Sequence, residues 1–435
     1  MALKEVLAKK IDEWRPRVTK LVKEYGNVKV DEVTIRQLYG GMRGIKCLTT
    51  DISYLDPYEG IRFRGYTIPE CLEKLPKPPG KDIPYDEGHF YLLLTGDIPT
   101  EEDVADVKAE WSKRYRIPDY VKDILRAFPR DTEAMTMFSA AVVSMQRESK
   151  FFKTYQEGKL GKMTAWEPMY EDVMDLLPKM ATIGAYIYRI KYRNDTPIEP
   201  DPDLDFGSNF AYMMGIPEPY DEVSRLYFLL HSDHESGNVS AHTGHLVASG
   251  LADIYYSISA MIDGLAGPLH GLANQETLKW IQKMMEDMNY QEPTKEALEK
   301  YCWDLLNSGQ VIPGYGHAVL RKTDPRYMAQ REYCLKHLPD DLTFKYVSML
   351  FEVVPPILQK HGKAKNPWPN VDAHSGCIQW HYGVREYNFY TCLFSIGRSL
   401  GVCANIIWDR AVGQAIERPK SLTTDMLEEI AGIKK

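Results

Sequence analysis

The sequence lacks the short motifs that mark the commonest nucleotide and metal sites. Neither G-x-x-x-x-G-K-[ST] nor G-x-G-x-x-G occurs, so a P-loop NTPase and a Rossmann dinucleotide site are not expected. The absence of H-E-x-x-H and H-x-x-E-H argues against a zincin or an inverzincin. The seven cysteines form no C-x-x-C pair, which indicates a reducing compartment without a disulfide framework or a zinc ribbon.

Excess positive charge, targeting signals and an unbroken apolar run are also missing. A net charge of −8 argues against a nucleic-acid partner, so any polyanionic ligand needs a local basic cluster. Residues 1–20 have neither an apolar signal core nor a transit-peptide composition, and residues 432–435 are no peroxisomal signal. If the protein acts in an organelle, we expect its leader to have been removed. Residues 387–408 are apolar but include Asn388, Arg398 and Asn405, so no membrane span is predicted.

What the sequence does contain is helical periodicity. Apolar residues recur at helical spacing in 133–145 and 272–288, and residues 240–259 are rich in Ala, Gly and Ser, which suits a closely packed helix. The best strand candidate is 47–53. The predicted fold is all-α with little strand, and the length of 435 residues predicts two or more lobes.

Three Gly/Pro-rich turns carry titratable side chains. His270 lies in Gly-Pro-Leu-His-Gly, His317 in Pro-Gly-Tyr-Gly-His, and Asp372 in Pro-Asn-Val-Asp-Ala-His-Ser-Gly. Such turns let a ligand approach the backbone closely, and two histidines with a carboxylate are the parts of an acid–base site. One histidine in a turn is more often structural, but three such turns favour catalysis. Because His270 precedes an amphipathic helix, we expect it to be either a neutral hydrogen-bond donor or a simple helix cap.

Two arginines and a basic loop indicate anionic ligands. Arg398 interrupts an apolar helix, where a buried guanidinium needs a structural carboxylate or an anionic substrate. Arg326 follows the turn of His317, and two guanidinium groups near an acid–base set suggest a dicarboxylate. Lys363 and Lys365 precede Asp372 and either contact phosphates or form a solvated loop.

The segment 231–245 contains four histidines, which leaves a metal site open. His231 and His234 have a spacing that can share a helix face, and His242 and His245 follow closely. Because the segment matches no metal-ligand motif, a hydrogen-bonding His234 at a helix end is the preferred interpretation.

Together, the motifs around His270, His317 and Asp372 resemble those of the citrate synthase family, in its long eukaryotic, mitochondrial-type form. The resemblance extends from Tyr39 to Lys420. It implies a large helical domain formed by residues 1–270 and 378–435, a smaller helical domain formed by residues 271–377, and an active cleft between them. It also implies a homodimer with shared active sites in the mitochondrial matrix, with a cytoplasmic location as the alternative.

The same resemblance implies a role for each site residue. His270 would bind the thioester oxygen of acetyl-CoA, Asp372 would remove a methyl proton, and His317 would bind and protonate the oxaloacetate carbonyl before citryl-CoA is hydrolysed. The oxaloacetate carboxylates would be held by His234, Arg326, Arg398 and Arg418 of the partner subunit. The CoA contacts would include Arg43, Val311, Gly314, Tyr315, Lys363 and Lys365. No metal, other cofactor, nucleic acid or membrane is implied.

Two positions depart from the family pattern, and other functions stay open. Lys162 stands where relatives often carry arginine, and Ser236 stands beside His234 where relatives commonly have glycine. A 2-methylcitrate synthase would use the same residues on propionyl-CoA. The alternatives from other classes are a zinc hydrolase built on the four histidines of 231–245 and a non-catalytic helical scaffold or filament subunit.

Overall fold

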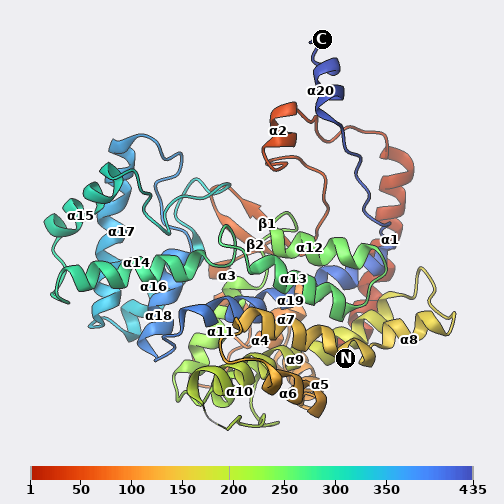
Figure 1. Cartoon of the computed structure of the whole chain (residues 1–435). Coiled ribbons are helices and arrows are strands. Elements are labelled where there is room, and N and C mark those ends of the chain that lie inside the picture. Colours follow the sequence, from red (N-terminus) through yellow and green to blue (C-terminus); the bar gives the residue numbers. More distant parts are fainter. Residues whose placement is uncertain (1, 195, 434–435) are drawn as a thin grey trace.

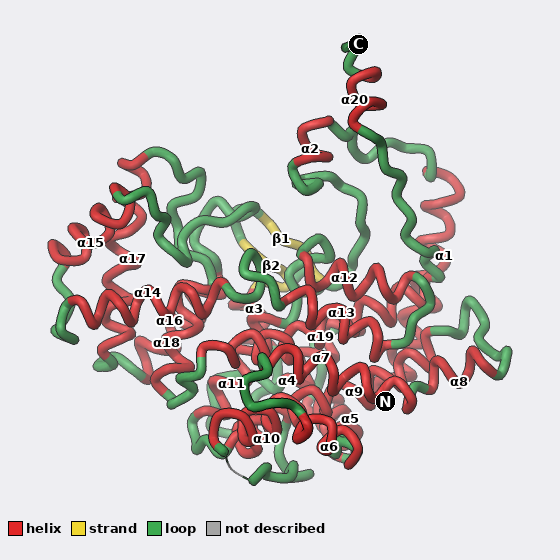
Figure 2. The backbone as a smooth tube through the Cα atoms, viewed as in Figure 1, coloured by secondary structure: helices red, strands yellow, loops and turns green. Residues whose placement is uncertain are grey.

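The chain folds into a mainly helical molecule with one small sheet. The computed structural model describes residues 2–194 and 196–433, and helices fill most of it (Figures 1 and 2). Up to residue 193 the elements are α1 (Leu3–Tyr25), α2 (Ile35–Tyr39), β1 (Ser53–Asp56), β2 (Gly60–Phe63), β3 (Tyr66–Thr67), α3 (Ile68–Lys74), α4 (Asp86–Thr95), α5 (Glu101–Ser112), α6 (Asp119–Ala127), α7 (Ala134–Ser144), η1 (Met145–Glu148), α8 (Lys150–Gln156), α9 (Trp166–Tyr188) and η2 (Arg189–Arg193). From residue 206 they are α10 (Phe206–Met214), α11 (Tyr220–His231), α12 (Val239–Ser249), α13 (Ile254–Leu265), α14 (Ala273–Asp287), α15 (Lys295–Asn307), α16 (Pro325–His337), α17 (Leu342–His361), α18 (Asp372–His381), η3 (Tyr387–Phe389), α19 (Tyr390–Val412) and α20 (Thr424–Ile430). The predicted all-α class is confirmed.

The sheet lies later in the sequence than predicted. Its strands are antiparallel in the order β1-β2-β3, and β1 pairs with β2 from Ser53↔Phe63 to Asp56↔Gly60. The hairpin is set by Asp56, whose Oδ1 accepts the N–H groups of the next turn. The expected strand at 47–53 is therefore wrong except at its last residue. Beyond Phe63 the N–H of Arg64 still donates to the Ile52 carbonyl at 2.9 Å, but Arg64 has φ +49° and the described strand pairing ends at Ser53↔Phe63.

Two predicted helices are confirmed and one is wrong. The segments 133–145 and 272–288 form α7 and α14, but 240–259 is divided between α12 and α13. The break follows Gly250: Leu251 has φ +63°, and the Asp253 carboxylate caps α13 by accepting the N–H of Tyr255 at 3.0 Å. The small residues do serve close packing, because a Cβ at Gly264 would lie 3.0 Å from the backbone of α12.

Helix α19 passes through the middle of the helices that precede α14 in the chain. It contacts α4, α9, α11, α12 and α13, and nearly all of it is buried. Within the described residues, Tyr387–Val412 is the stretch long and apolar enough to cross a membrane, but 94% of its apolar window is buried inside the protein. The expectation of a buried helix is met, and Arg398 lies in its middle.

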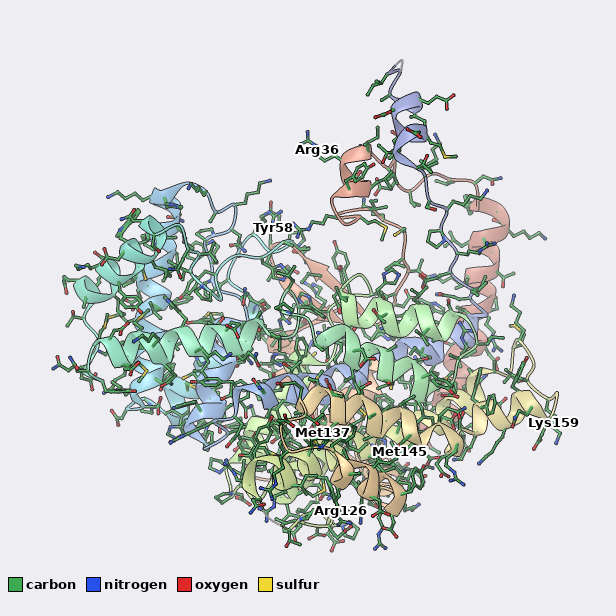
Figure 3. All side chains as sticks on the ribbon, in the orientation of Figure 1. Arg36, Tyr58, Arg126, Met137, Met145 and Lys159 are labelled. Atoms are coloured by element: carbon green, nitrogen blue, oxygen red, sulfur yellow. The ribbon has the colours of Figure 1, made fainter. Side chains whose placement is uncertain are left out.

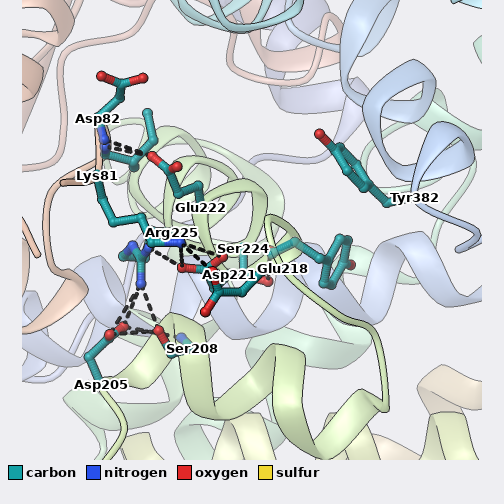
Figure 4. A network of polar contacts seen from close by, with 12 residues as sticks. Lys81, Asp82, Asp205, Ser208, Glu218, Asp221, Glu222, Ser224, Arg225 and Tyr382 are labelled. Carbon is teal, nitrogen blue, oxygen red and sulfur yellow. Dashed lines mark hydrogen bonds and ion pairs between the residues drawn. The ribbon is translucent and has the colours of Figure 1, made fainter. Parts of the chain in front are cut away.

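A buried ionic network fixes α11, which leads into the site (Figure 4). The Arg225 guanidinium is fully buried and donates to Asp221 at 2.6 Å on its own helix and to Asp205 at 3.0 Å at the start of α10. Gly207 makes room for the Arg225 side chain, because a Cβ there would lie 2.4 Å from Cγ of Arg225. Helix α11 is thereby locked against α10, and it ends at His231.

Helices α14 to α18 form a second group, which lies at the left of Figure 1. They pack mainly on one another, through α14 with α18, α15 with α17 and α16 with α18. Contacts of α16 with α3 and of α18 with α11 join this group to the rest of the chain. The turns that carry His317 and Asp372 both belong to it.

Candidate active site

Hydrogen bonds tie the turn that carries His317 to the segment that leads into Asp372. The N–H of Gly316 donates to the Trp368 carbonyl at 2.9 Å, and the Asn370 amide donates back to the Gly316 carbonyl at 2.9 Å. The Asn370 carbonyl oxygen Oδ1 also accepts the N–H of Asp372 at 2.9 Å. Two motifs that are far apart in sequence are therefore held as one unit.

Gly314 lets this unit close. Its φ is +76°, a backbone conformation that other residues adopt at a cost, and a Cβ would lie 2.8 Å from Cα of Ala373. Ala373 follows Asp372 in the first turn of α18. The glycine therefore brings the turn against the helix that begins with the carboxylate.

His317 has a defined tautomer. Its Nδ1 accepts the N–H groups of Val319 at 3.0 Å and Leu320 at 3.1 Å, so a neutral ring carries its proton on Nε2. Burial, helped by the charge of Arg326, lowers the pKa of His317 to about 4. Near neutral pH this ring is an uncharged donor.

His270 has the opposite tautomer. Its Nε2 accepts the N–H of Ser240 at 3.3 Å in the first turn of α12, which leaves the proton on Nδ1. Burial, and then Arg398, lowers the pKa of His270 to about 4. The neutral ring was expected at the N-terminus of the helix that follows it. In the structure the ring instead contacts the N-terminus of α12. The helix that follows His270 in sequence gives no such contact.

Asp372 begins α18 and is half-buried. Burial raises the pKa of its carboxyl to about 6, against the opposing effect of Arg326. The group is therefore mostly ionised at neutral pH yet more basic than an ordinary aspartate. Such a carboxylate is suited to accept a proton from a weak carbon acid.

Arg326 presents one free edge. The guanidinium is buried, and its Nη2 and Nε donate to the Asp324 carboxylate, with Nη2 2.7 Å from Oδ2. Asp324 also caps α16 by accepting the N–H of Arg326 at 3.0 Å. No described residue accepts from Nη1, so half of the fork remains for an anion.

Arg398 is buried, and none of the described carboxylates forms an ion pair with it. It donates from Nε to the His231 carbonyl at 3.1 Å and from Nη1 to Asn238 at 3.0 Å and Ser240 at 3.2 Å. These acceptors are all neutral oxygens, so of the two interpretations left open by the sequence the anionic substrate is favoured over a structural ion pair.

His234 faces His317, with ring centroids 5.6 Å apart. Its Nε2 is buried and has no hydrogen-bond partner among residues 2–194 and 196–433. Burial, and then the charges of Arg326 and His317, hold the pKa of His234 well below its usual value. The ring is therefore neutral, and its Nε2 is open for a hydrogen bond.

The remaining predicted residues lie at the surface of the chain. Val311, Lys363 and Lys365 are exposed, while Gly314 and Tyr315 are half-buried beside the His317 turn. Arg43 is exposed in the segment after α2, and Arg418 is exposed next to Glu417, which is hydrogen-bonded to His242 of α12. Neither arginine is brought to the histidines of its own chain by a contact in the described structure.

Lys162 also lies away from the CoA candidates. Its side chain passes Gly413 at the end of α19, in the loop after α8 where Lys159 projects outward (Figure 3). The CoA candidates Val311 and Lys363 follow α15 and α17, and these two helices lie on the opposite side of the molecule from α8. Ser236 is buried, and the positive φ beside His234 falls on Glu235 instead.

Three of the four histidines of 231–245 have separate partners, which argues against the zinc alternative. Nδ1 of His231 donates to the Tyr227 carbonyl at 2.8 Å, His242 contacts Glu417 at 3.0 Å and His245 contacts Asp409 at 2.8 Å. No cluster of three or more His, Cys, Asp or Glu suited to a metal occurs in the described part of the chain.

Sequence reasoning missed the residues that orient these groups. Asp324, Asn238 and Ser240 hold Arg326, Arg398 and His270. A signal was available for two of them: Asp324 precedes Pro325, and Asn238 precedes a small-residue helix, and both are helix N-cap patterns.

Comparison with known proteins identifies the family. The family model "Citrate synthase, C-terminal domain" matches residues 41–420. The chain belongs to the citrate synthase family. It is 52% identical to "Probable citrate synthase, mitochondrial" of Glossina morsitans morsitans over 98% of this chain and 92% of that protein. It is 51% identical to "Citrate synthase, mitochondrial" of Xiphias gladius, over 99% and 92%. The implied mitochondrial location agrees with both names.

Solved citrate synthases share the fold. The enzyme of Pyrobaculum aerophilum has a TM-score of 0.75 and 28% identity, covering 88% of this chain and 92% of that one. The citrate synthase of Thermoplasma acidophilum, solved as a ternary complex with carboxymethyl coenzyme A and oxaloacetate, has a TM-score of 0.74 and 25% identity, covering 91% and 97%. The family assignment sets aside the scaffold and hydrolase alternatives and does not favour 2-methylcitrate synthesis.

Proposed function

We propose that this protein condenses acetyl-CoA with oxaloacetate and water to give citrate and CoA. The observations that carry the proposal are the neutral histidines His270 and His317, which have opposite tautomers, and the basic carboxylate of Asp372, whose segment is hydrogen-bonded to the His317 turn. One donor is needed for each of the two carbonyl oxygens that gain negative charge, and one base is needed for the methyl proton.

In the first step the Asp372 carboxylate removes a proton from the acetyl methyl group. The electron pair moves onto the thioester oxygen, which accepts the Nδ1–H of His270. A methyl group beside a thioester is a weak acid, so the carboxylate alone is too weak a base and the fixed donor supplies the missing stabilisation.

In the second step the enol carbon attacks the ketone carbon of oxaloacetate. A carbon–carbon bond forms, the carbonyl bond opens, and the ketone oxygen takes the proton from Nε2 of His317. Arg326, Arg398 and His234 hold the dicarboxylate during the attack. Water then hydrolyses the citryl-CoA thioester, releasing citrate and CoA.

The CoA moiety is assigned to residues near the His317 turn and the basic loop, and to Arg43 from the segment after α2. We assign it to Arg43, Val311, Gly314, Tyr315, Lys363 and Lys365, with the two lysines facing phosphates. In this proposal residues 271–377 form the small CoA-binding domain and residues 1–270 and 378–435 the large one. The mutual packing of α14 to α18 supports the division, although α18 continues past residue 377 to His381.

A homodimer with shared sites completes the proposal, with Arg418 of the partner subunit binding an oxaloacetate carboxylate. Its support is the projecting group formed by the end of α1, α2 and α20. Large apolar side chains are exposed there: Leu21, Val22, Tyr25, Val28, Val30, Val33, Ile35, Leu38, Tyr39, Met42, Leu422, Met426 and Ile430. An apolar surface of this extent marks an interface. No metal is assigned a role, because the base and the two donors account for each proton transfer.

The decisive experiment measures free CoA released from acetyl-CoA with and without oxaloacetate. We expect release that depends on oxaloacetate and on this protein, and slower release from propionyl-CoA. If no CoA appears above background with both substrates, the assignment is wrong. Faster turnover of propionyl-CoA would instead identify a 2-methylcitrate synthase.

A further inference from the structure

The turn that carries His234 holds a strained backbone. It links α11 to α12, and Glu235 has φ +61° although it is not glycine. Such a conformation costs on the order of 1–3 kcal/mol and persists only where surrounding contacts impose it. The contacts that impose it therefore also set the direction of the neighbouring His234 ring.

Those contacts come from the small sheet. The Ser53 hydroxyl at the start of β1 accepts the N–H of Glu235 at 3.0 Å and donates to the Asp233 carboxylate at 2.6 Å. Two residues along the strand, the N–H of Leu55 donates to the Glu235 carboxylate at 2.9 Å. One hydroxyl thus holds the residues on both sides of His234.

Helix α19 closes the turn from the other side. The N–H of Gly401 donates to the Ser232 carbonyl at 3.1 Å, and a Cβ at Gly401 would lie 2.4 Å from Cβ of Asp233. The Asn405 amide lies 3.4 Å from the same Asp233 oxygen that Ser53 contacts. Asp233 is fully buried, so these hydrogen bonds leave it little freedom to move.

We propose that Ser53 and Glu235 are positioning residues for oxaloacetate binding: they fix His234 so that its open Nε2 points at the substrate. The inference rests on the substrate role proposed for His234. It gives the small sheet a function. No β1 side chain belongs to the proposed catalytic set, but β1 contacts the His234 turn through Ser53 and Leu55.

The test is the dissociation constant for oxaloacetate, measured by calorimetry without acetyl-CoA, so that it does not depend on turnover. Ser53→Ala should weaken binding about 10-fold, as expected when a binding group loses its orientation. In kinetics, the KM for oxaloacetate should rise more than the KM for acetyl-CoA. The same substitution in a His234→Ala background should cause almost no further loss, because coupled residues are not additive.

Ser149→Ala is the matched control. Ser149 is also buried, and its hydroxyl donates to the Asp172 carboxylate at 2.6 Å and accepts the N–H of Phe152 at 2.9 Å. It makes the same kinds of hydrogen bond as Ser53, but it caps α8 and does not contact the His234 turn. It should lose comparable thermal stability and keep the affinity for oxaloacetate. Equal weakening in both variants would mean that the loss comes from general destabilisation and would overturn the proposal.

Glu235→Gly keeps the inference testable if Ser53→Ala does not fold. Glycine adopts φ +61° freely, so the fold should be retained while the bond to Leu55 is lost. We expect weaker oxaloacetate binding without a matching loss of melting temperature, and Glu235→Gln, which keeps an acceptor oxygen, should restore affinity. Wild-type affinity in Glu235→Gly would refute the positioning role. Wild-type protein that binds oxaloacetate but releases no CoA would refute the proposed function alone.

Discussion

At the scale of single residues, burial decides the protonation state of the site. Burial lowers the pKa of His270 and His317 to about 4 and raises that of Asp372 to about 6. Two donors that stay neutral and a base that stays ionised then coexist over the same pH range. The division of roles follows from burial, which is the largest cause of each shift and disfavours the charged form of all three side chains.

The first prediction concerns Asp372→Asn. Turnover should fall by roughly two or more orders of magnitude, as for the loss of a general base, while oxaloacetate still binds. CoA release and calorimetry measure the two quantities. Asp340→Asn, at an exposed aspartate, is the control and should keep full activity. Near-normal turnover in Asp372→Asn would remove this residue from the mechanism.

The same substitution should stabilise the fold. The folded-state pKa of Asp372, about 6, lies above its unfolded value of 3.8, so the native state loses stability as the pH rises from about 4 to about 6, and the full cost remains above that. Asparagine removes that cost, and we expect a gain on the order of 1–3 kcal/mol at pH 7 that vanishes below pH 4. Urea denaturation at the two pH values tests this, and an equal gain at both would contradict the assigned pKa.

The pH dependence of kcat/KM should show one acid limb. Asp372 must be ionised to accept a proton, so activity should rise with pH through a midpoint near 6. The two histidines are already neutral above pH 5 and should add no second limb there. Steady-state rates from pH 5 to 8 measure it, and a flat profile would mean that another group is the base.

At the scale of elements, the turn that carries His317 lies against the first turn of α18. Gly314→Ala should lose activity and about 2–4 kcal/mol of stability, because a positive φ and a 2.8 Å approach to Ala373 both oppose a side chain. Gly309→Ala is the matched control, since its φ is +84° but its surroundings are open. It should lose stability by the backbone cost alone and remain active. Equal losses in the two variants would show that contact with α18 is unimportant.

Sequence alone predicted elements where periodicity was continuous. The apolar repeats of α7 and α14 were sufficient, whereas the break between α12 and α13 depended on the capping carboxylate of Asp253, which a small-residue composition hides. The strand was misplaced because pairing depends on the hairpin at Asp56, not on the composition of residues 47–52.

For the site, the sequence predicted residue types but not the contacts that orient them. The three motif turns led directly to His270, His317 and Asp372. The ties from Asn370 to the His317 turn and from Ser53 to the His234 turn join segments that are far apart in the chain. No local pattern encodes such pairs, so only the folded structure reveals them.

At the scale of the whole molecule, the shared-site proposal predicts complementation. Arg418→Ala and Asp372→Asn subunits should each be nearly inactive alone. After subunit exchange, a mixed dimer would contain one site with both lesions and one with neither, so activity should reappear. Lys420→Ala, two residues from Arg418 and also exposed, is the control and should be active by itself. Verified mixed dimers without activity would mean that Arg418 serves its own subunit.

The anchoring of the His234 turn by β1 also bears on how the chain is made. Ser53 leaves the ribosome long before Glu235, and the α19 residues that close the turn follow much later. Contacts between such distant segments form slowly, because a long loop must close before they add stability. An oxaloacetate site of native affinity should therefore appear late in refolding, after most helical signal has returned, and nascent chains that stop before α19 should lack it.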